Sequence, residues 1–388
     1  MKIVYIFNSL AYKGGAERIV SEKMSWLADV AGHDVTAVTC HQSADSQPNT
    51  YPLSPRVRQV NLSIPFFRQY QYHYPRRLWV KWHYQRELRR QLQANIDALQ
   101  PDIVVGMSYM MADVVCHIKT TAPIVIESHE ARRYTQSSLL FGNISWLSKI
   151  YRRLHRHTYL HTIEKRARVV VTLTASNARE WRKARRVEVI PNFSTMAVSG
   201  MTSGDNKRAI AVGRIEWQKG YDRMIDIWQR VTRRHPDWRL DIYGEGTLEK
   251  DIQTNIQRRG LTNVSIHPFT PHISEEYATS DICLLTSRFE GFSLVLLEAM
   301  RHGVPCVAFD CPYGPAEVVD DGQCGYVVSD GDLQQFADRV CTLIERQDLR
   351  ATFTKASLQK AQAYDMTTIM RQWDDLFRLL AKDQHDYT

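Results

Sequence analysis

The sequence lacks the cysteine pattern of a disulfide-stabilised or zinc-binding protein. Its cysteines are odd in number, stand at positions 40, 116, 283, 306, 311, 324 and 341, and include no Cys-x-x-Cys pair. Most of them lie in or beside apolar runs, which is typical of buried, reduced thiols. The cysteines therefore favour a reducing compartment such as the cytosol over a disulfide or zinc framework.

Long apolar runs are also absent. No stretch reaches the roughly 18 apolar residues of a transmembrane helix. The first eight residues resemble a strand and have neither the long apolar region nor the cleavage site of a signal peptide. Short repeats and low-complexity tracts are missing as well. An apolar content of 44% and a charged content of 24% are typical of a globular protein, and 388 residues are enough for two or three domains.

Acidic residues are scarce in the first half of the chain. Residues 1–190 hold 28 Lys and Arg against 14 Asp and Glu, net +14, whereas the remainder holds 22 against 28, net −6. Basic and aromatic residues mix in 66–92 and again in 132–168. This mixture suits an anionic membrane surface or a lipid-diphosphate acceptor, although solvated helix faces packed by aromatic residues would show the same pattern. Nucleic-acid binding is disfavoured, because no helix-turn-helix, zinc or RNA-binding motif accompanies the charge.

Strands and helices alternate along the chain, which predicts an α/β fold with parallel sheets. A helix is expected at 16–31, and the best linker is the small, polar stretch 196–207. Strands are expected at 3–7, 35–39, 103–106, 124–127, 169–173 and 187–190, and then near 209–212, 239–243, 264–267, 282–285, 305–309 and 325–328. Two βα sheets with a switch near residues 191–193 fit two Rossmann-like lobes.

The most informative feature is a pair of glutamates, Glu290 and Glu298, that stand eight residues apart. A buried strand pattern at 282–285 precedes them, and another strand follows at 304–309. Glu290 would open a loop where helix N-terminal amides point at a ligand, and Glu298 would lie about two turns along the helix. A carboxylate there is suited to binding paired hydroxyls, although Glu298 could also be a helix residue paired with Arg301.

Two cations are predicted at the end of another strand. The strand at 209–212 leads into Gly213-Arg214, and Lys219-Gly220 follows. Open α/β sheets bind ligands at the carboxyl ends of their strands. Arg214 offers a bidentate fork and Lys219 a point charge, so together they could hold a diphosphate.

The first half has its own candidate residues. Gly14 and Gly15 lie between the first strand and the first helix, where glycine allows close approach of a phosphate or sugar. The sequence is not Gly-x-Gly-x-x-Gly, so the dinucleotide fingerprint is absent, and a plain βα turn is the alternative. His129 follows the strand at 124–127 and could equally be a structural histidine at a loop start.

The combination resembles the retaining nucleotide-sugar glycosyltransferases of the GT4 type, and the resemblance covers nearly the whole chain. It is carried by 14–17, Glu127-Ser128-His129, Gly213-Arg214 with Lys219-Gly220, 290–298 and 310–317. The last of these segments, 310–317, is similar to a segment found in family members that build bacterial surface polysaccharides. The resemblance implies the GT-B fold, in which two Rossmann-like lobes face each other across a cleft. It implies an acceptor-binding lobe at 1–192, a donor-binding lobe at 193–365 and a C-terminal helix at 366–388 that packs back on the first lobe.

The resemblance also implies roles for individual residues. Gly15 would close over the donor diphosphate, and His129 would face the donor sugar near the bond that breaks. Glu290 would bind the sugar hydroxyls and Glu298 the ribose. The amides of Gly291, Phe292 and Ser293 would hold sugar and phosphate, although many relatives have glycine where Ser293 stands. Arg214 and Lys219 would stabilise the charge that develops on the leaving diphosphate.

The resulting expectation is a metal-independent hexosyltransferase that retains configuration by front-face attack. No Asp-x-Asp motif stands in the context of a metal site, so no metal or other cofactor is expected. The donor would be a UDP-linked hexose or N-acetylhexosamine, and the acceptor a glycan or lipid-linked glycan at the cytoplasmic face of the inner membrane. The alternatives are a nucleotide-sugar 2-epimerase of the same fold and a non-enzymatic basic membrane- or RNA-binding protein.

Overall fold

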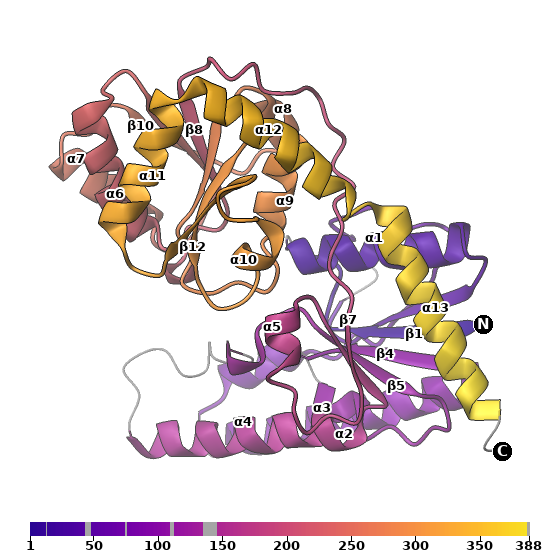
Figure 1. The fold of residues 1–388 in the computed structure, drawn as a ribbon. Coiled ribbons are helices and arrows are strands. Elements are labelled where there is room, and N and C mark those ends of the chain that lie inside the picture. Colours follow the sequence, from indigo (N-terminus) through magenta and orange to yellow (C-terminus); the bar gives the residue numbers. More distant parts are fainter. Residues whose placement is uncertain (13, 43–47, 74–75, 109–111, 135–145, 386–388) are drawn as a thin grey trace. The chain divides into compact units, whose positions relative to one another are not determined.

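The chain divides into two compact units, each built on one parallel sheet that helices cover (Figure 1). Unit 1 comprises Met1–Ile190 with Ile369–Thr388, and unit 2 comprises Pro191–Thr368. The predicted α/β class with two parallel sheets is therefore confirmed. The structure, a computed structural model, describes residues 1–12, 14–42, 48–73, 76–108, 112–134 and 146–385.

The sheet of unit 1 has its strands in the order β3-β2-β1-β4-β5-β6-β7, and every pairing is parallel. The order reverses between β1 and β4, which makes the end of β1 a topological switch point. The strands are β1 (Lys2–Phe7), β2 (Asp34–Thr39), β3 (Arg58–Asn61), β4 (Ile103–Met107), β5 (Ile124–Ser128), β6 (Val169–Thr172) and β7 (Val187–Val189).

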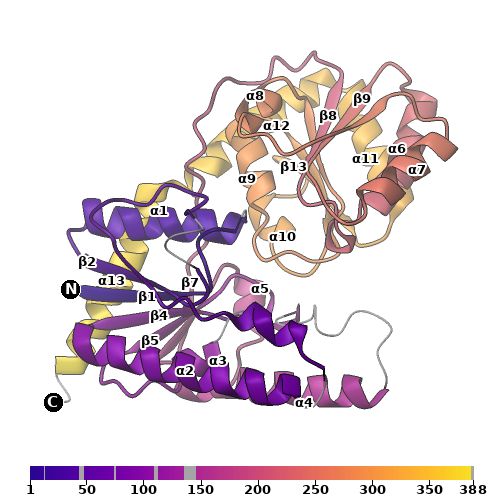
Figure 2. The ribbon, with the colours of Figure 1, turned by 180° about the vertical axis from the view of Figure 1, so that it is seen from behind.

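Helices cover both faces of this sheet. One face carries α1 (Gly15–Asp29) and α13 (Met366–His385), and the other carries α2 (Arg76–Leu99), α3 (Ala112–Val115) and α4 (Trp146–Arg166) (Figures 1 and 2). Strand periodicity decides which side chains reach which layer, because successive residues point to opposite faces. Short helical segments lie at η1 (Phe66–Gln71), η2 (Arg132–Tyr134) and α5 (Ala175–Ala178).

Unit 2 repeats the plan with the order β10-β9-β8-β11-β12-β13, again parallel at every pairing, so its switch point lies between β8 and β11. Its strands are β8 (Arg208–Val212), β9 (Arg239–Tyr243), β10 (Val264–His267), β11 (Ile282–Leu285), β12 (Cys306–Asp310) and β13 (Gly325–Ser329). Its helices are η4 (Trp217–Lys219), α6 (Tyr221–Arg234), α7 (Glu249–Arg258), α8 (Ile273–Ala278), α9 (Leu294–Arg301), α10 (Pro315–Val318), α11 (Leu333–Glu345) and α12 (Gln347–Gln362).

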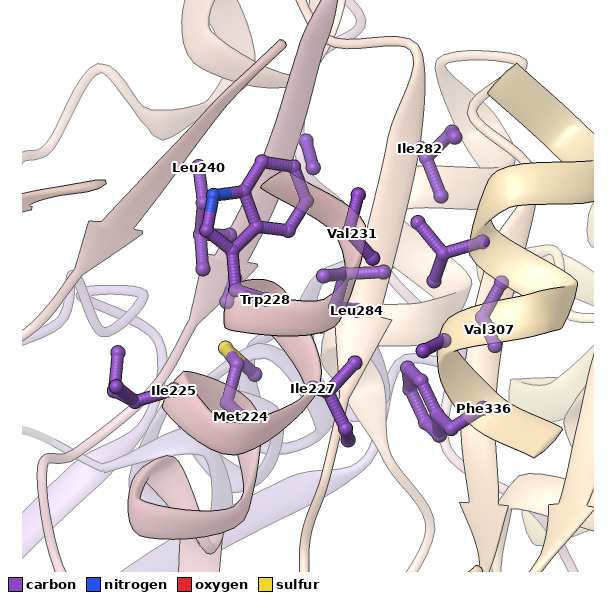
Figure 3. Close-up of a cluster of buried hydrophobic side chains, with 14 of the residues drawn as sticks. Met224, Ile225, Ile227, Trp228, Val231, Leu240, Ile282, Leu284, Val307 and Phe336 are labelled. Atoms are coloured by element: carbon purple, nitrogen blue, oxygen red, sulfur yellow. The ribbon is translucent and has the colours of Figure 1, made fainter. Parts of the chain in front are cut away.

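The core of unit 2 forms where α6 and α11 pack on the sheet (Figure 3). Helix α6 buries apolar residues at helical spacing, among them Met224, Trp228 and Val231. They meet strand residues such as Leu284 and the ring of Phe336 from α11. Complete burial of a large apolar side chain contributes about 1.5–3 kcal/mol, so this layer holds the strand ends of unit 2 in fixed positions.

The structure differs from the sequence expectation at a few elements. Every expected strand is present. The strand ends differ by one residue at most, or by two where the strand after the glutamate pair was expected to begin at 304, and the helix expected at 16–31 runs over Gly15–Asp29. The edge strand β3 was not expected. Within the described residues, no helix has the length and apolar character needed to span a bilayer.

Candidate active site

The candidate site of unit 2 lies at its topological switch point. The loops that follow β8 and β11 leave the sheet side by side there, because these two strands are neighbours whose connections run in opposite directions. The first loop carries Arg214 and Lys219, and the second carries Glu290. The sheet therefore brings the loop of Arg214 and Lys219 next to the loop of Glu290, although Lys219 and Glu290 are 71 residues apart in the sequence.

Lys219 and Glu290 form an ion pair. Lys219 Nζ lies 2.8 Å from Glu290 Oε1, and the two side chains are 16% and 7% exposed. Ser287 Oγ donates to the same carboxylate oxygen at 2.5 Å. Gly213 has a φ of 149°, and a Cβ at that position would lie 3.2 Å from Lys219 Cε, so glycine makes room for the lysine stem. The predicted clamp lysine and the predicted sugar-binding glutamate thus form an ion pair with each other.

Arg214 differs from its neighbour. Its side chain is exposed, and within the described residues the guanidinium makes no ion pair or hydrogen bond. Its backbone is fixed, because the Glu216 amide donates to the Arg214 carbonyl at 2.8 Å and the next residue, Ile215, is bonded to Glu245. An exposed cation on a fixed backbone, in the same loop as Lys219, is suited to an anionic ligand.

The loop after Glu290 leads into helix α9. The Glu290 amide donates to the Pro312 carbonyl at 3.1 Å, Gly291 is partly exposed, and Phe292 is buried with its ring edge on Tyr364, the centroids 5.5 Å apart. Ser293 precedes the first turn of α9, where amides lack intrahelical partners. The amides of Gly291, Phe292 and Ser293 therefore lie in the loop and helix start predicted for them.

Ser293 has two unusual properties. Its φ is +67°, a left-handed conformation that favours glycine. Its side chain is buried, and Oγ has no hydrogen-bond partner within the described residues. A strained backbone with an unsatisfied hydroxyl is the kind of outlier that clusters at ligand sites.

Glu298 lies on the buried side of α9 and is 5% exposed. The Tyr277 hydroxyl lies 3.5 Å from Glu298 Oε2. One turn later, His302 Nδ1 bonds to the Glu298 carbonyl at 2.8 Å and its Nε2 contacts Ser274 Oγ at 2.8 Å. Burial lowers the pKa of His302, so this ring stays neutral and serves to fix the helix. Glu298 is thus a buried carboxylate on a well-anchored helix.

In unit 1, Gly14 and Gly15 stand at the switch point after β1. Gly14 is the N-cap of α1 with an extended backbone, and Gly15 is the first helical residue and is exposed. A Cβ at Gly14 would lie 2.1 Å from Glu17 Oε2. Glycine at position 14 therefore leaves room for the Glu17 carboxylate at the helix start, and the anion-binding role of Gly15 stays a prediction.

His129 belongs to a buried chain of polar groups. Glu127 Oε2 lies 2.8 Å from His129 Nε2, and Glu127 Oε1 lies 2.7 Å from Lys23 Nζ. The side chains of Lys23, Glu127 and His129 are all less than 5% exposed. Above the lysine, the Trp373 ring of α13 lies with its centroid 3.3 Å from Nζ. His129 is therefore a buried, oriented histidine.

Sequence reasoning missed Lys23 and Trp373. A signal for Lys23 was present, because it stands between Val20, Met24 and Leu27 on the apolar stripe of α1. A lysine on a buried stripe needs a partner charge, and Glu127 is 104 residues away in sequence. Within the described residues, no group of three His, Cys, Asp or Glu is arranged to hold a metal ion.

Comparison with known proteins covers both units. The family described as "Glycosyl transferase 4-like domain" matches residues 14–192, and the family described as "Glycosyl transferases group 1" matches residues 198–360. The chain is 35% identical over 170 residues to the amylovoran biosynthesis glycosyltransferase AmsD of Erwinia amylovora, a match that covers 44% of this chain and 47% of the relative. The chain thus spans about half the length of that relative.

Two further similarities extend over the whole chain. An uncharacterized glycosyltransferase of Haemophilus influenzae is 24% identical over 383 residues, with 96% of this chain and 98% of that protein covered. Among solved structures, a mutant of S. aureus TarM in complex with Fondaparinux, alpha-GlcNAc-glycerol and UDP has a TM-score of 0.75 at 15% identity, with 97% and 99% covered. The two parallel α/β units, the two family matches and these relatives together show that the chain belongs to the GT4-type glycosyltransferases with the GT-B fold.

Proposed function

We propose that this protein is a retaining glycosyltransferase that moves a hexose or N-acetylhexosamine from a UDP-linked sugar to a glycan or lipid-linked glycan. The observation that carries the proposal is the Lys219–Glu290 pair at the β8/β11 switch point, where the loop after β8 also carries the exposed Arg214. A diphosphate entering there would meet two cations, and the carboxylate that Lys219 releases would be available to sugar hydroxyls.

The donor side of the proposal assigns one role to each residue. Arg214 and Lys219 bind the diphosphate and stabilise the charge that develops on it, which is why metal independence belongs to the proposal. Glu290 binds the sugar, the amides of Gly291 to Ser293 hold sugar and phosphate, and the buried Glu298 binds the ribose. The complex of TarM with UDP supports a uridine nucleotide.

Retention of configuration is the second part of the proposal. Sugars in UDP-hexoses are α-linked, so an α-linked product corresponds to retention. The TarM complex that contains alpha-GlcNAc-glycerol supports this outcome for a protein with the same fold. His129 and Gly15 of unit 1 take the roles that the resemblance implies, near the donor sugar and the donor diphosphate respectively.

The acceptor is proposed to be lipid-linked and to lie at an anionic membrane, on the cytoplasmic face of the inner membrane. Helices α2 and α4 run side by side on one face of the unit 1 sheet (Figures 1 and 2). On α2, the side chains of Trp79 and Trp82 are 63% and 54% exposed and lie on the same side of the helix as Arg86. On α4, Leu154 is exposed. Aromatic and apolar side chains mixed with arginines suit the boundary between headgroups and acyl chains. Within the predicted run 66–92, Tyr74 and Pro75 lie outside the described residues.

Co-sedimentation with vesicles tests the membrane part. The protein should bind vesicles rich in phosphatidylserine at low salt and leave them at high salt, because each basic residue near the surface contributes about 1 kcal/mol that salt screens. A variant with five cations of α2 replaced by glutamine should bind the vesicles more weakly and keep its affinity for UDP. The five replaced residues are Arg76, Arg77, Lys81, Arg89 and Arg90. Equal binding to neutral and anionic vesicles would leave this helix as an ordinary solvated face.

Incubation with UDP-sugars tests the reaction class. The proposal predicts that sugar transfer depends on a lipid-diphosphate or glycan acceptor and that excess EDTA does not stop it. The epimerase alternative, which needs the same diphosphate clamp and ribose glutamate, predicts a change in the sugar without any acceptor. Conversion of the donor in acceptor-free mixtures would therefore favour the epimerase.

A further inference from the structure

Lys23 is a fully buried charge of unit 1, and its side chain is 2% exposed. It is enclosed by β1, β5 and α13, whose contributions are Tyr5, Glu127 and Trp373. Glu127 contacts Lys23 with one carboxylate oxygen and His129 with the other, at 2.7 and 2.8 Å. Glu127 is thus a bridge between a buried cation and a histidine proposed to act on the donor sugar.

The charges of this group compensate one another. Burial lowers the pKa of Lys23 to about 8, although Glu127 attracts its charge. Burial alone would raise the pKa of Glu127, but the attraction of Lys23 and the hydrogen bond from His129 outweigh it and leave that pKa below its usual value. Burial raises the pKa of Tyr5. At neutral pH the group therefore holds Lys23 as a cation, Glu127 as an anion and Tyr5 uncharged.

This balance determines how the ring of His129 is protonated. An ionised carboxylate only accepts hydrogen bonds, so the His129 nitrogen that contacts Glu127 must carry a proton. Lys23 contacts the other oxygen of the same carboxylate at 2.7 Å, so one carboxylate orients both groups. Within the described residues, no hydrogen bond reaches Nδ1. Because Nε2 donates to Glu127, Nδ1 is the ring nitrogen left to meet a ligand.

We propose that Lys23 is a positioning residue for the sugar-transfer reaction. By keeping Glu127 ionised, it holds the His129 proton on Nε2 and presents Nδ1 as an acceptor to a hydroxyl group of the donor sugar. The ring is also locked in orientation, because Glu127 stands on β5 and cannot turn without leaving Lys23. This inference rests on the proposed function for its chemical role, but its claim about the ring does not.

Helix α13 completes this arrangement. Trp373 is 2% exposed and covers Lys23 with the face of its indole ring, a favourable contact for a cation. The neighbouring Asp374 contacts His33 Nε2 at 2.6 Å, which fixes the helix to the turn after α1. The residue that covers Lys23 thus comes from the last helix of the chain.

A purely structural ion pair is the competing explanation. Replacing a buried ion pair by neutral residues of similar volume is often neutral or stabilising, so stability alone is a weak reason to keep one. The burial that lowers the pKa of Lys23 also shows that its charge is held at a cost. The two explanations differ in what happens to the His129 ring when Lys23 is removed.

NMR of the full-length protein with ¹⁵N-labelled histidine distinguishes them, with His129 assigned by its loss in His129→Gln. The parent ring should carry its proton on Nε2 and none on Nδ1. In Lys23→Met the ring should become the counter-charge of Glu127 and carry a proton on Nδ1 as well. If Lys23→Met does not fold, Lys23→Met/Glu127→Gln removes both charges and should give mixed tautomers. An Nδ1 that stays unprotonated in the single variant, or the parent tautomer in the double variant, would overturn the proposal.

Kinetics supply the second readout. Lys23→Met should lower kcat at pH 7 by roughly 10²-fold, the cost of a misplaced group, with the KM for the UDP-sugar within about twofold of the parent. Ile163→Ala is the control for lost stability, because it opens a cavity where α4 packs in the core of the same unit. Its kcat should stay near that of the parent protein. Equal losses in both variants would reduce Lys23 to a structural role. If the parent transfers no sugar, the proposed function fails, whereas the ring measurement still decides the claim about Lys23.

Discussion

Replacing Glu298 tests whether unit 2 binds a ribose. The carboxylate is buried on α9, so two ribose hydroxyls that donate to it would make charge-assisted hydrogen bonds in a poorly solvated place. Loss of that pair should cost about 1.5–3 kcal/mol, which corresponds to a roughly tenfold to hundredfold weaker Kd for UDP. Glu298→Ala removes both acceptor oxygens. Glu298→Gln keeps the volume and one acceptor, so it should weaken the Kd for UDP by a factor near the lower end of this range.

Calorimetry with UDP and 2′-deoxy-UDP makes this prediction specific. The parent should bind UDP more tightly than the deoxy nucleotide, and in Glu298→Ala the two affinities should converge, because the residue that reads the hydroxyls is gone. Glu345→Ala is the matched control, since Glu345 is an exposed glutamate of the same unit that pairs with Arg234. Circular dichroism should confirm that both variants are folded. An unchanged UDP affinity in folded Glu298→Ala, or equal losses for the two nucleotides, would refute the ribose assignment.

Three further outcomes follow from the same structure. Arg214→Ala and Lys219→Ala should each lower turnover by roughly 10²–10³ and weaken binding of UDP and of free diphosphate alike, and loss of UDP binding alone would contradict a diphosphate clamp. Ser293→Gly should raise the melting temperature of the protein, because it removes about 1–2 kcal/mol of strain from a left-handed backbone and a buried hydroxyl without a hydrogen bond. A lower melting temperature would show that the hydroxyl has a partner. Burial lowers the pKa of Lys23 to about 8, whereas the unfolded chain keeps it near 10.5, so the unfolded chain binds more protons between these pH values. The Lys23 contribution to the free energy of unfolding should therefore become more favourable as the pH rises from about 8 to 10.5, which urea melts at several pH values measure. Lys23→Met/Glu127→Gln should lack that rise.

The sheets were predictable because their strands are buried on both faces. Ile282–Leu285 and Val169–Thr172 are continuous apolar or β-branched runs, and such runs indicate parallel strands without any alternation to interpret. Strand β3 was missed because Arg58–Asn61 contains a single apolar residue, Val60, and lies at a sheet edge where burial is partial. Local pattern therefore identifies central strands and loses polar edge strands.

The candidate site was predictable only residue by residue. Motif context indicated Arg214, Lys219 and Glu290, but not that Lys219 and Glu290 form an ion pair, because their contact depends on β8 and β11 being neighbours. The pairing of Lys23 with Glu127 depends in the same way on α1 packing over β5. Contacts of this kind arise from sheet order, which a single sequence indicates only in outline.

The most direct test of the central claim is the anomeric configuration of the product. The protein is incubated with UDP-N-acetylglucosamine and other UDP-hexoses, an acceptor that carries a lipid diphosphate, and EDTA, and the new glycosidic bond is examined by proton NMR at early times. We predict an α-linked product that forms without metal and disappears in Glu290→Gln. A β-linked product, or a donor sugar altered without transfer, would contradict it.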